Sequence, residues 1–97
     1  MAVLYKTTGE IIILSPNNKK SFSYNELTAC VGGMVEIVPL PSGKVMVVNE
    51  EGKLIGLPIN DLATDEWKKE YPIDRYPLNN DQLVVGDALI CSDTEIE

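Results

Sequence analysis

Two dense apolar runs, residues 34–40 and 44–49, occupy the middle of the chain and are separated by the polar loop Pro-Ser-Gly. Short runs of this kind around a glycine-containing loop are typical of a β-hairpin, because Gly43 can take the positive φ that a tight loop requires. A Glu-Glu-Gly sequence follows and predicts a second tight turn, after which residues 53–57 would form a third strand. The pattern therefore predicts an antiparallel meander over residues 34–57.

The N-terminal segment predicts either two further short strands, residues 3–5 and 10–14, around the turn signal Thr8-Gly9, or one bent strand. Residues 11–14 are apolar without alternation, and a continuous run of this type indicates a strand covered on both faces. Such a strand would lie either in the centre of the sheet or against a partner subunit. Because residues 34–40 also have two apolar faces, we expect a homo-oligomer.

The first helix is predicted from a capping box. Ser23 and Glu26 have the spacing at which each side chain can bond the backbone N–H of the other residue. Leu27 begins an apolar stripe at helical spacing, and the glycine pair 32–33 can supply the left-handed residue that ends a helix. We therefore expect a helix of about two turns that packs on the sheet.

The C-terminal part predicts a second helix that begins at Asn60 or Asp61 and ends near residue 69. A proline-rich excursion over residues 71–81 leads into a last strand, residues 82–91, in which Gly86 is interpreted as a bulge. We expect residues 92–97 to be a frayed acidic tail.

These elements predict a single α+β domain over residues 1–97, with two short helices and a small antiparallel-dominated sheet that is open or curled toward a barrel. A chain of this length can bury a core but not a deep enclosed cavity. We therefore expect any sizeable pocket to lie between subunits.

The charge balance argues against direct nucleic-acid binding. There are 8 Lys and Arg against 15 Asp and Glu, which gives a net charge of −7, whereas phosphate backbones bind to clustered cations. An acidic surface suits a basic protein partner or the mimicry of nucleic-acid charge. No apolar run approaches the roughly 18 residues that a membrane span needs. With two widely separated cysteines and no secretory signal, we expect a cytoplasmic protein.

The residue types favour binding over catalysis. The chain has no histidine, which removes the commonest general base and the commonest zinc ligand. It also has no glycine-rich phosphate loop, and we predict neither a metal site nor a cofactor. Glu36 could pair with Glu50 or Glu51, but neighbouring acids at a hairpin tip are exposed and poorly suited to acid–base work. We expect a protein without enzymatic activity.

The best binding candidate is the sequence Asn-Glu-Glu-Gly-Lys that follows the second central strand, because amide, turn N–H and ammonium groups together can hold a phosphate, a ribose or a protein backbone. The same residues could simply form a solvated turn. Glu36 is a single acid on an otherwise apolar strand face and can point into a pocket. The predicted ligand-binding residues are Tyr24, Glu36, Asn49, Glu50, Glu51, Lys53 and Asn60.

Four blocks of the chain, ELTACVGG, MVEIV, VVNEEGKLIGLPIN and VVGDALI, resemble the family of domains of unknown function numbered thirty-eight forty-six. Asp61 departs from the pattern, since relatives often have arginine there, so a positive contact at this position is not expected here. The resemblance implies an origin in a bacteriophage or mobile element. The hypothesis that follows is an anti-defence binding protein that sequesters a small nucleotide-derived host immune signal. The alternative is an acidic inhibitor of a host defence or nucleic-acid enzyme, in the extreme case a DNA mimic.

Overall fold

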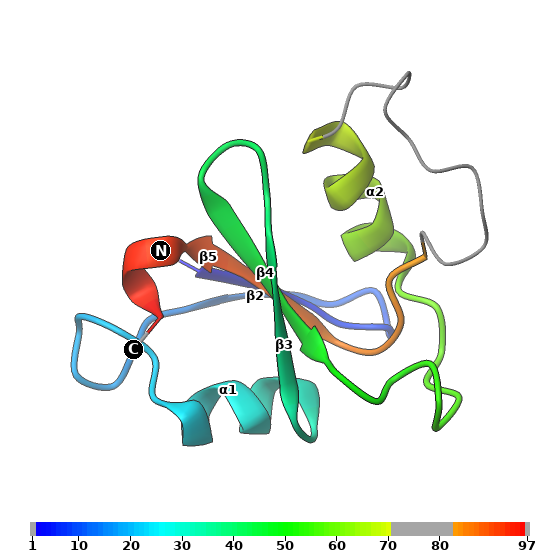
Figure 1. Ribbon diagram of the computed structural model, residues 1–97, viewed down its shortest axis with the longest axis horizontal. Helices are drawn as coiled ribbons and strands as arrows, with labels where there is room; N and C mark the ends of the chain where they lie inside the picture. The colour runs from blue at the N-terminus through cyan, green and yellow to red at the C-terminus, as the bar shows by residue number, and fades with distance from the viewer. Residues whose placement is uncertain (1, 71–82, 97) are drawn as a thin grey trace.

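The computed structural model describes residues 2–70 and 83–96, and its centre is an open antiparallel sheet of five strands (Figure 1). The strand order is β2-β1-β5-β4-β3, so β2 and β3 are the free edges. The α+β class is confirmed, and the sheet is not closed into a barrel. The strands are β1 (Ala2–Tyr5), β2 (Ile11–Leu14), β3 (Val35–Pro39), β4 (Lys44–Asn49) and β5 (Ala88–Ser92).

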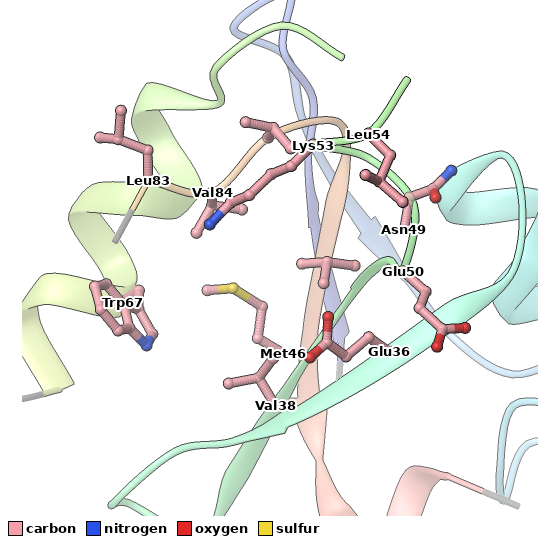
Figure 2. Close-up of a pocket in the computed structure, with 12 residues that line it drawn as sticks. Glu36, Val38, Met46, Asn49, Glu50, Lys53, Leu54, Trp67, Leu83 and Val84 are labelled. Carbon is pink, nitrogen blue, oxygen red and sulfur yellow. The ribbon is translucent and has the colours of Figure 1, made fainter. Parts of the chain in front are cut away.

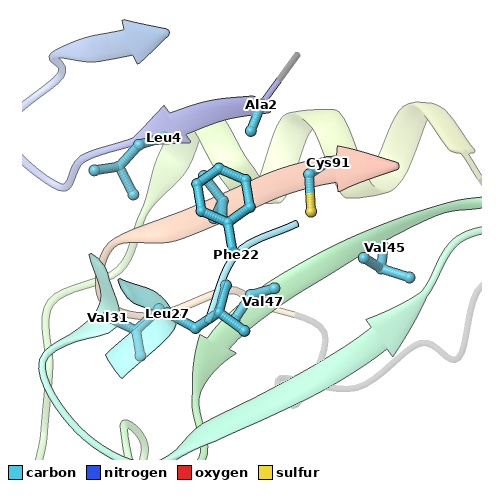
Figure 3. Close-up of a cluster of buried hydrophobic side chains, with 9 residues drawn as sticks. Ala2, Leu4, Phe22, Leu27, Val31, Val45, Val47 and Cys91 are labelled. Atoms are coloured by element: carbon cyan, nitrogen blue, oxygen red, sulfur yellow. The ribbon is translucent and has the colours of Figure 1, made fainter. Parts of the chain in front are cut away.

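One helix covers each face of this sheet: α1 (Tyr24–Val31) lies on one side and α2 (Asp61–Glu70) on the other (Figure 1). Under α1, Phe22 packs with residues from three strands, β1, β4 and β5, in the larger buried cluster (Figure 3). Under α2, Met46, Ala63 and Ala88 form a smaller cluster that partly buried side chains extend. Alternate residues of the central strands therefore serve two separate cores.

Helix α1 begins and ends as its sequence predicts. The Ser23 hydroxyl accepts from the Glu26 N–H, and the Glu26 carboxylate accepts from the Ser23 N–H. Gly32 ends the helix with a φ of 78°, in the left-handed region where glycine is favoured. Glu26 also accepts from the N–H of Asn17, so its carboxylate joins the preceding loop to the helix.

The β3–β4 hairpin also forms as predicted, around Gly43 with a φ of 92°. Leu40 N donates to Lys44 O, which makes these residues a hydrogen-bonded pair. Because bonded and non-bonded pairs alternate in an antiparallel ladder, Pro39 occupies a position whose backbone nitrogen faces away from β4. The proline therefore fits β3 without loss of a ladder bond, and it marks this strand as an edge.

The predicted third strand of the meander is wrong. Residues 53–57 form successive turns, with Ile55 N donating to Glu51 O and Leu57 N to Gly52 O. Gly56 has a φ of 73°, which a β-strand cannot accommodate. The place beside β4 is taken by β5, which lies between β4 and β1.

One interpretation of the apolar run in β2 placed this strand in the centre of the sheet, and that interpretation is wrong. The strand lies at the sheet edge with Ile11 and Ile13 56% and 65% exposed. The last strand is shorter than predicted, and Gly86 precedes it in a turn rather than forming a bulge. The predicted excursion over residues 71–81 lies outside the described residues.

The acidic tail, expected to be frayed, is held in place through Glu95. Residues Asp93–Glu95 form a short 3-10 helix, η3, whose Ser92 and Glu95 make a second capping box. Phe22 N donates to Glu95 O at 2.6 Å, and Phe22 also forms a β-bridge with Ile96. Capping and pairing therefore order a segment whose composition suggested disorder.

The capping box of α1 predicts a pH-dependent stability. Hydrogen bonds from the backbone of Ser23, and then of Asn17, hold the pKa of Glu26 below its usual 4.5. The carboxylate therefore stabilises the fold above that pH, and the contribution is lost as the pH falls through the lowered pKa. Glu26→Gln should lower the melting temperature most near neutral pH, and the difference from the parent protein should shrink below pH 4.5. Thermal melts across this range check it, and a difference independent of pH would contradict the assignment.

Candidate functional site

An open groove of about 260 Å³ lies on the α2 face of the sheet, between α2 and the β3–β4 hairpin (Figure 2). It is lined within a single chain, contrary to the expectation that a pocket would need two subunits. Its lining residues are mostly apolar, with acids and a lysine at one end. They are Glu36, Val38, Met46, Val48, Asn49, Glu50, Lys53, Leu54, Trp67, Leu83, Val84 and Val85.

The register of the hairpin builds the floor. Val38 lies opposite Met46, and Glu36 lies opposite Val48. Directly opposite residues in an antiparallel pair project from the same face. Glu36 is therefore an exposed carboxylate in a row of aliphatic side chains, at the end of the floor nearest the turn after β4.

The walls of the groove add an aromatic ring and an ammonium group to this aliphatic floor. Figure 2 shows the indole of Trp67, on α2, on one side of the groove, and the Lys53 side chain, from the turn after β4, extending over it. The Glu36 carboxylate points into the same space. An aromatic ring, an ammonium group and a carboxylate thus surround an aliphatic surface.

Buried Asn60 fixes the N-terminal end of α2. Its Oδ1 accepts from the N–H of Ala63, so it caps the helix, and its Nδ2 donates to the carbonyls of Tyr5 and Gly86, both at 2.8 Å. The side chain is fully buried with each of these groups bonded. One amide therefore joins the helix, β1 and the turn before β5.

The first turn of α2 also positions the groove wall. Asn60 N donates to Val84 O at 2.7 Å, and Val84 N donates to the hydroxyl of Thr64 at 2.9 Å. Thr64 is buried at this contact. These bonds place Val84 and its neighbour Val85 beside the floor.

The far end of α2 is tied to the hairpin tip. The carboxylate of Glu70 accepts from both the N–H and the hydroxyl of Ser42, at 3.2 and 3.0 Å. The helix is thus bonded to the rest of the fold at both ends. This arrangement sets the separation between Trp67 and the sheet.

The Asn49 side chain supports the turn rather than facing the groove. Its Nδ2 donates to Val31 O, and its Oδ1 accepts from Glu51 N. Figure 2 shows the amide directed away from the groove. A Cβ on Gly33 would lie 2.9 Å from Nδ2, so the second glycine of the pair leaves room for this amide. Asn49 therefore joins the end of α1 to the turn that carries Lys53.

The structure brings together four of the seven predicted binding residues. Glu36, Asn49, Glu50 and Lys53 line the groove, Asn49 with its amide already bonded. The others do not line it: Glu51 is exposed on the turn, Asn60 is the buried cap of α2, and Tyr24 is 55% exposed on α1, on the opposite face.

The predicted binding residues did not include the apolar lining of the groove, above all Trp67. The period-two pattern of β3 and β4 already places Val38 and Met46 on one face with Glu36. What no local pattern shows is that α2 leaves part of this face uncovered.

The cysteines behave as small hydrophobic side chains. Cys91 is 1% exposed, and Cys30 is partly buried against the α1 core. Burial raises the pKa of Cys91 to about 11 and also raises the pKa of Cys30. Both thiols are therefore protonated at neutral pH and poor nucleophiles.

Residues 2–70 and 83–96 have neither a cluster of metal-ligating side chains nor a helix suited to a membrane. No cluster of three or more His, Cys, Asp or Glu side chains there could hold a metal ion. Neither α1 nor α2 has the length and apolar character needed to cross a membrane.

Comparison with known proteins identifies the family but no function. The family model described as Domain of unknown function (DUF3846) matches residues 1–97, and the chain belongs to this family. No curated protein and no solved structure matches the chain.

Removing the Asn60 amide should destabilise the whole fold. Asn60→Ala leaves the buried carbonyls of Tyr5 and Gly86 without this donor and uncaps α2, which should cost about 2–4 kcal/mol. Urea denaturation measures this, and the exposed Asn25→Ala should change stability by no more than about 0.5 kcal/mol. A small effect of Asn60→Ala would show that the groove does not depend on this cap.

Gly52 should be intolerant of a side chain because of packing, since its φ is not positive. A Cβ there would lie 3.0 Å from Val85 and 3.3 Å from Leu57 and from the carbonyl of Asn49. Gly52→Val should therefore destabilise by about 1–3 kcal/mol. The neighbouring exposed Lys53→Glu should change stability by no more than about 0.5 kcal/mol. Equal melting temperatures for both variants would argue against this packing.

Proposed function

We propose that this member of a family of unknown function is a non-enzymatic binding protein whose groove holds a nucleoside or mononucleotide. The observation that supports it is the convergence of Trp67, Glu36 and Lys53 around one aliphatic floor. Each matches one part of such a ligand.

Each contact rests on ordinary recognition chemistry. A base can stack on the Trp67 ring and rest on Val38 and Met46. A carboxylate such as that of Glu36 accepts hydrogen bonds from ribose hydroxyls. The ammonium group of Lys53 can pair with a phosphate.

The size and charge of the groove limit the ligand. Small-molecule pockets commonly measure about 300–1,000 Å³, so a groove of about 260 Å³ suits one nucleoside unit rather than an oligonucleotide. Glu50 at the polar end and the net charge of −7 oppose a ligand with several phosphates. A monophosphate therefore fits better than a triphosphate.

The biological role that we propose is the sequestration of a nucleotide-derived immune signal by a phage or mobile-element protein in the cytoplasm of a bacterial host. Binding without turnover is sufficient for such a role. Within residues 2–70 and 83–96, the groove lining includes no histidine or cysteine that would serve as a catalytic base or nucleophile.

A specific observation favours a second candidate, an acidic inhibitor of a host protein. Leu54 and Ile55, at the turn beside the groove, are 86% and 61% exposed. Large apolar side chains displayed at a rim can anchor a protein partner, and the net negative charge would steer a basic one. In this case the groove would receive a partner side chain.

Trp67 is the only tryptophan, so its fluorescence reports directly on the groove. Titration with adenosine monophosphate should quench it saturably, and adenosine triphosphate should bind more weakly. Glu36→Gln should weaken binding of the monophosphate roughly tenfold or more, through loss of charged hydrogen bonds to ribose. The weakening should be smaller for the deoxyribose form.

Glu51→Gln is the matched control, because it also removes one negative charge but lies on the turn after β4, outside the groove lining. It should leave binding unchanged. If nucleosides and nucleotides leave the fluorescence unaltered, the ligand proposal fails. Capture of a host protein that weakens steeply with added salt and requires Leu54 would then support the inhibitor.

A further inference from the structure

We propose that β2 is a dimerisation edge, where a second copy of this chain adds its own β2 in antiparallel orientation and continues the sheet. The surface is separate from the groove, since none of the groove-lining residues belongs to β1 or β2.

The hairpin between β1 and β2 determines which residues of β2 face outward. Lys6 N donates to Glu10 O at 2.9 Å, so these two residues form a hydrogen-bonded pair. Bonded and non-bonded pairs alternate along the ladder. Ile12 therefore bonds to β1, opposite Leu4, whereas the N–H and C=O groups of Ile11 and Ile13 point away from β1.

The side chains of the same two residues are exposed. Ile11 and Ile13 lie opposite Tyr5 and Val3, on the face that carries α2, and they are 56% and 65% exposed. Two isoleucines therefore present both outward backbone groups and uncovered apolar surface on one strand. An unguarded edge of this composition favours pairing with another strand.

A second copy matches this edge in one register. A two-fold axis at Ile12 places Ile11 of each copy opposite Ile13 of the other, on the same face of the joined sheet. Because both residues have outward backbone groups, the two copies make two reciprocal pairs of hydrogen bonds. The exposed isoleucines then pack against each other across the strands.

The charges flanking β2 also suit a second copy. Glu10 precedes the strand, while Lys19 and Lys20 lie in the loop that follows it, and β2 itself has no charge. Antiparallel pairing directs the acidic end of one copy toward the basic end of the other. This opposes the repulsion expected between two chains of net charge −7.

The other free edge has the features that block such pairing. β3 contains Pro39, which lacks a donor on its outward side, and the exposed acid Glu36. It offers a matched control, because Ile37 is also exposed and also has its N–H directed away from the neighbouring strand. Both edges therefore expose apolar side chains, but β3 also carries residues that block pairing with another strand.

Sedimentation equilibrium at micromolar concentrations tests the proposal. The parent protein should have twice the chain mass of 10.7 kDa. Ile13→Pro removes an outward donor without breaking a bond to β1, so it should give a folded monomer. Ile37→Pro makes the same change on β3 and should leave the dimer intact. A parent protein that is monomeric throughout, or a dimer that persists in Ile13→Pro, would overturn the proposal.

Two further measurements test the proposal even if the proline variant misfolds. Ile13→Lys keeps the backbone donor and places a charge at the interface, and it should also give a monomer with an unchanged circular dichroism spectrum. In the parent protein, the amides of Ile11 and Ile13 should exchange slowly with solvent at concentrations where the dimer forms, and quickly on dilution. Rapid exchange of both amides within a dimer would place the interface elsewhere and overturn the proposal.

Discussion

The arrangement depends most on one buried amide, that of Asn60. A fully buried polar side chain is costly unless its hydrogen bonds are made, and this one bonds the N–H of Ala63 and the carbonyls of Tyr5 and Gly86. These partners belong to three segments that are distant in the sequence. Only one position of α2 over the sheet makes all three bonds, so the amide specifies the placement of the helix and the Trp67 wall of the groove.

Local signals predicted most of the secondary structure, and long-range pairing accounts for the errors. The capping box of Ser23 and Glu26 involves neighbouring residues, and it formed as predicted. The prediction of a third strand in the meander failed because β5, some forty residues later in the chain, occupies that edge of β4. The apolar run of β2 indicated burial on both faces, but periodicity does not show whether a strand lies at an edge.

The binding site was also predictable only in part, because local sequence signals do not show contacts between distant segments. Glu36 stood out as an acid on an apolar strand face, and it lies in the groove. Asn49 and Asn60 have the same residue type and similar turn contexts, but their amides are occupied by backbone groups from distant segments. Trp67 looks like a core residue because a helical stripe does not show where its helix stops covering the sheet. Sequence therefore identified the polar end of the groove and not its apolar walls.

The central claim is that the space between α2 and the β3–β4 hairpin is where this protein binds its ligand. Amide and indole chemical shifts recorded while adenosine monophosphate is added test this most directly. We predict changes confined to Glu36, Met46, Lys53 and Trp67 with their neighbours, and none around Tyr24 on the opposite face. Saturable changes centred on the α1 face, with the Trp67 indole unaffected, would contradict the account.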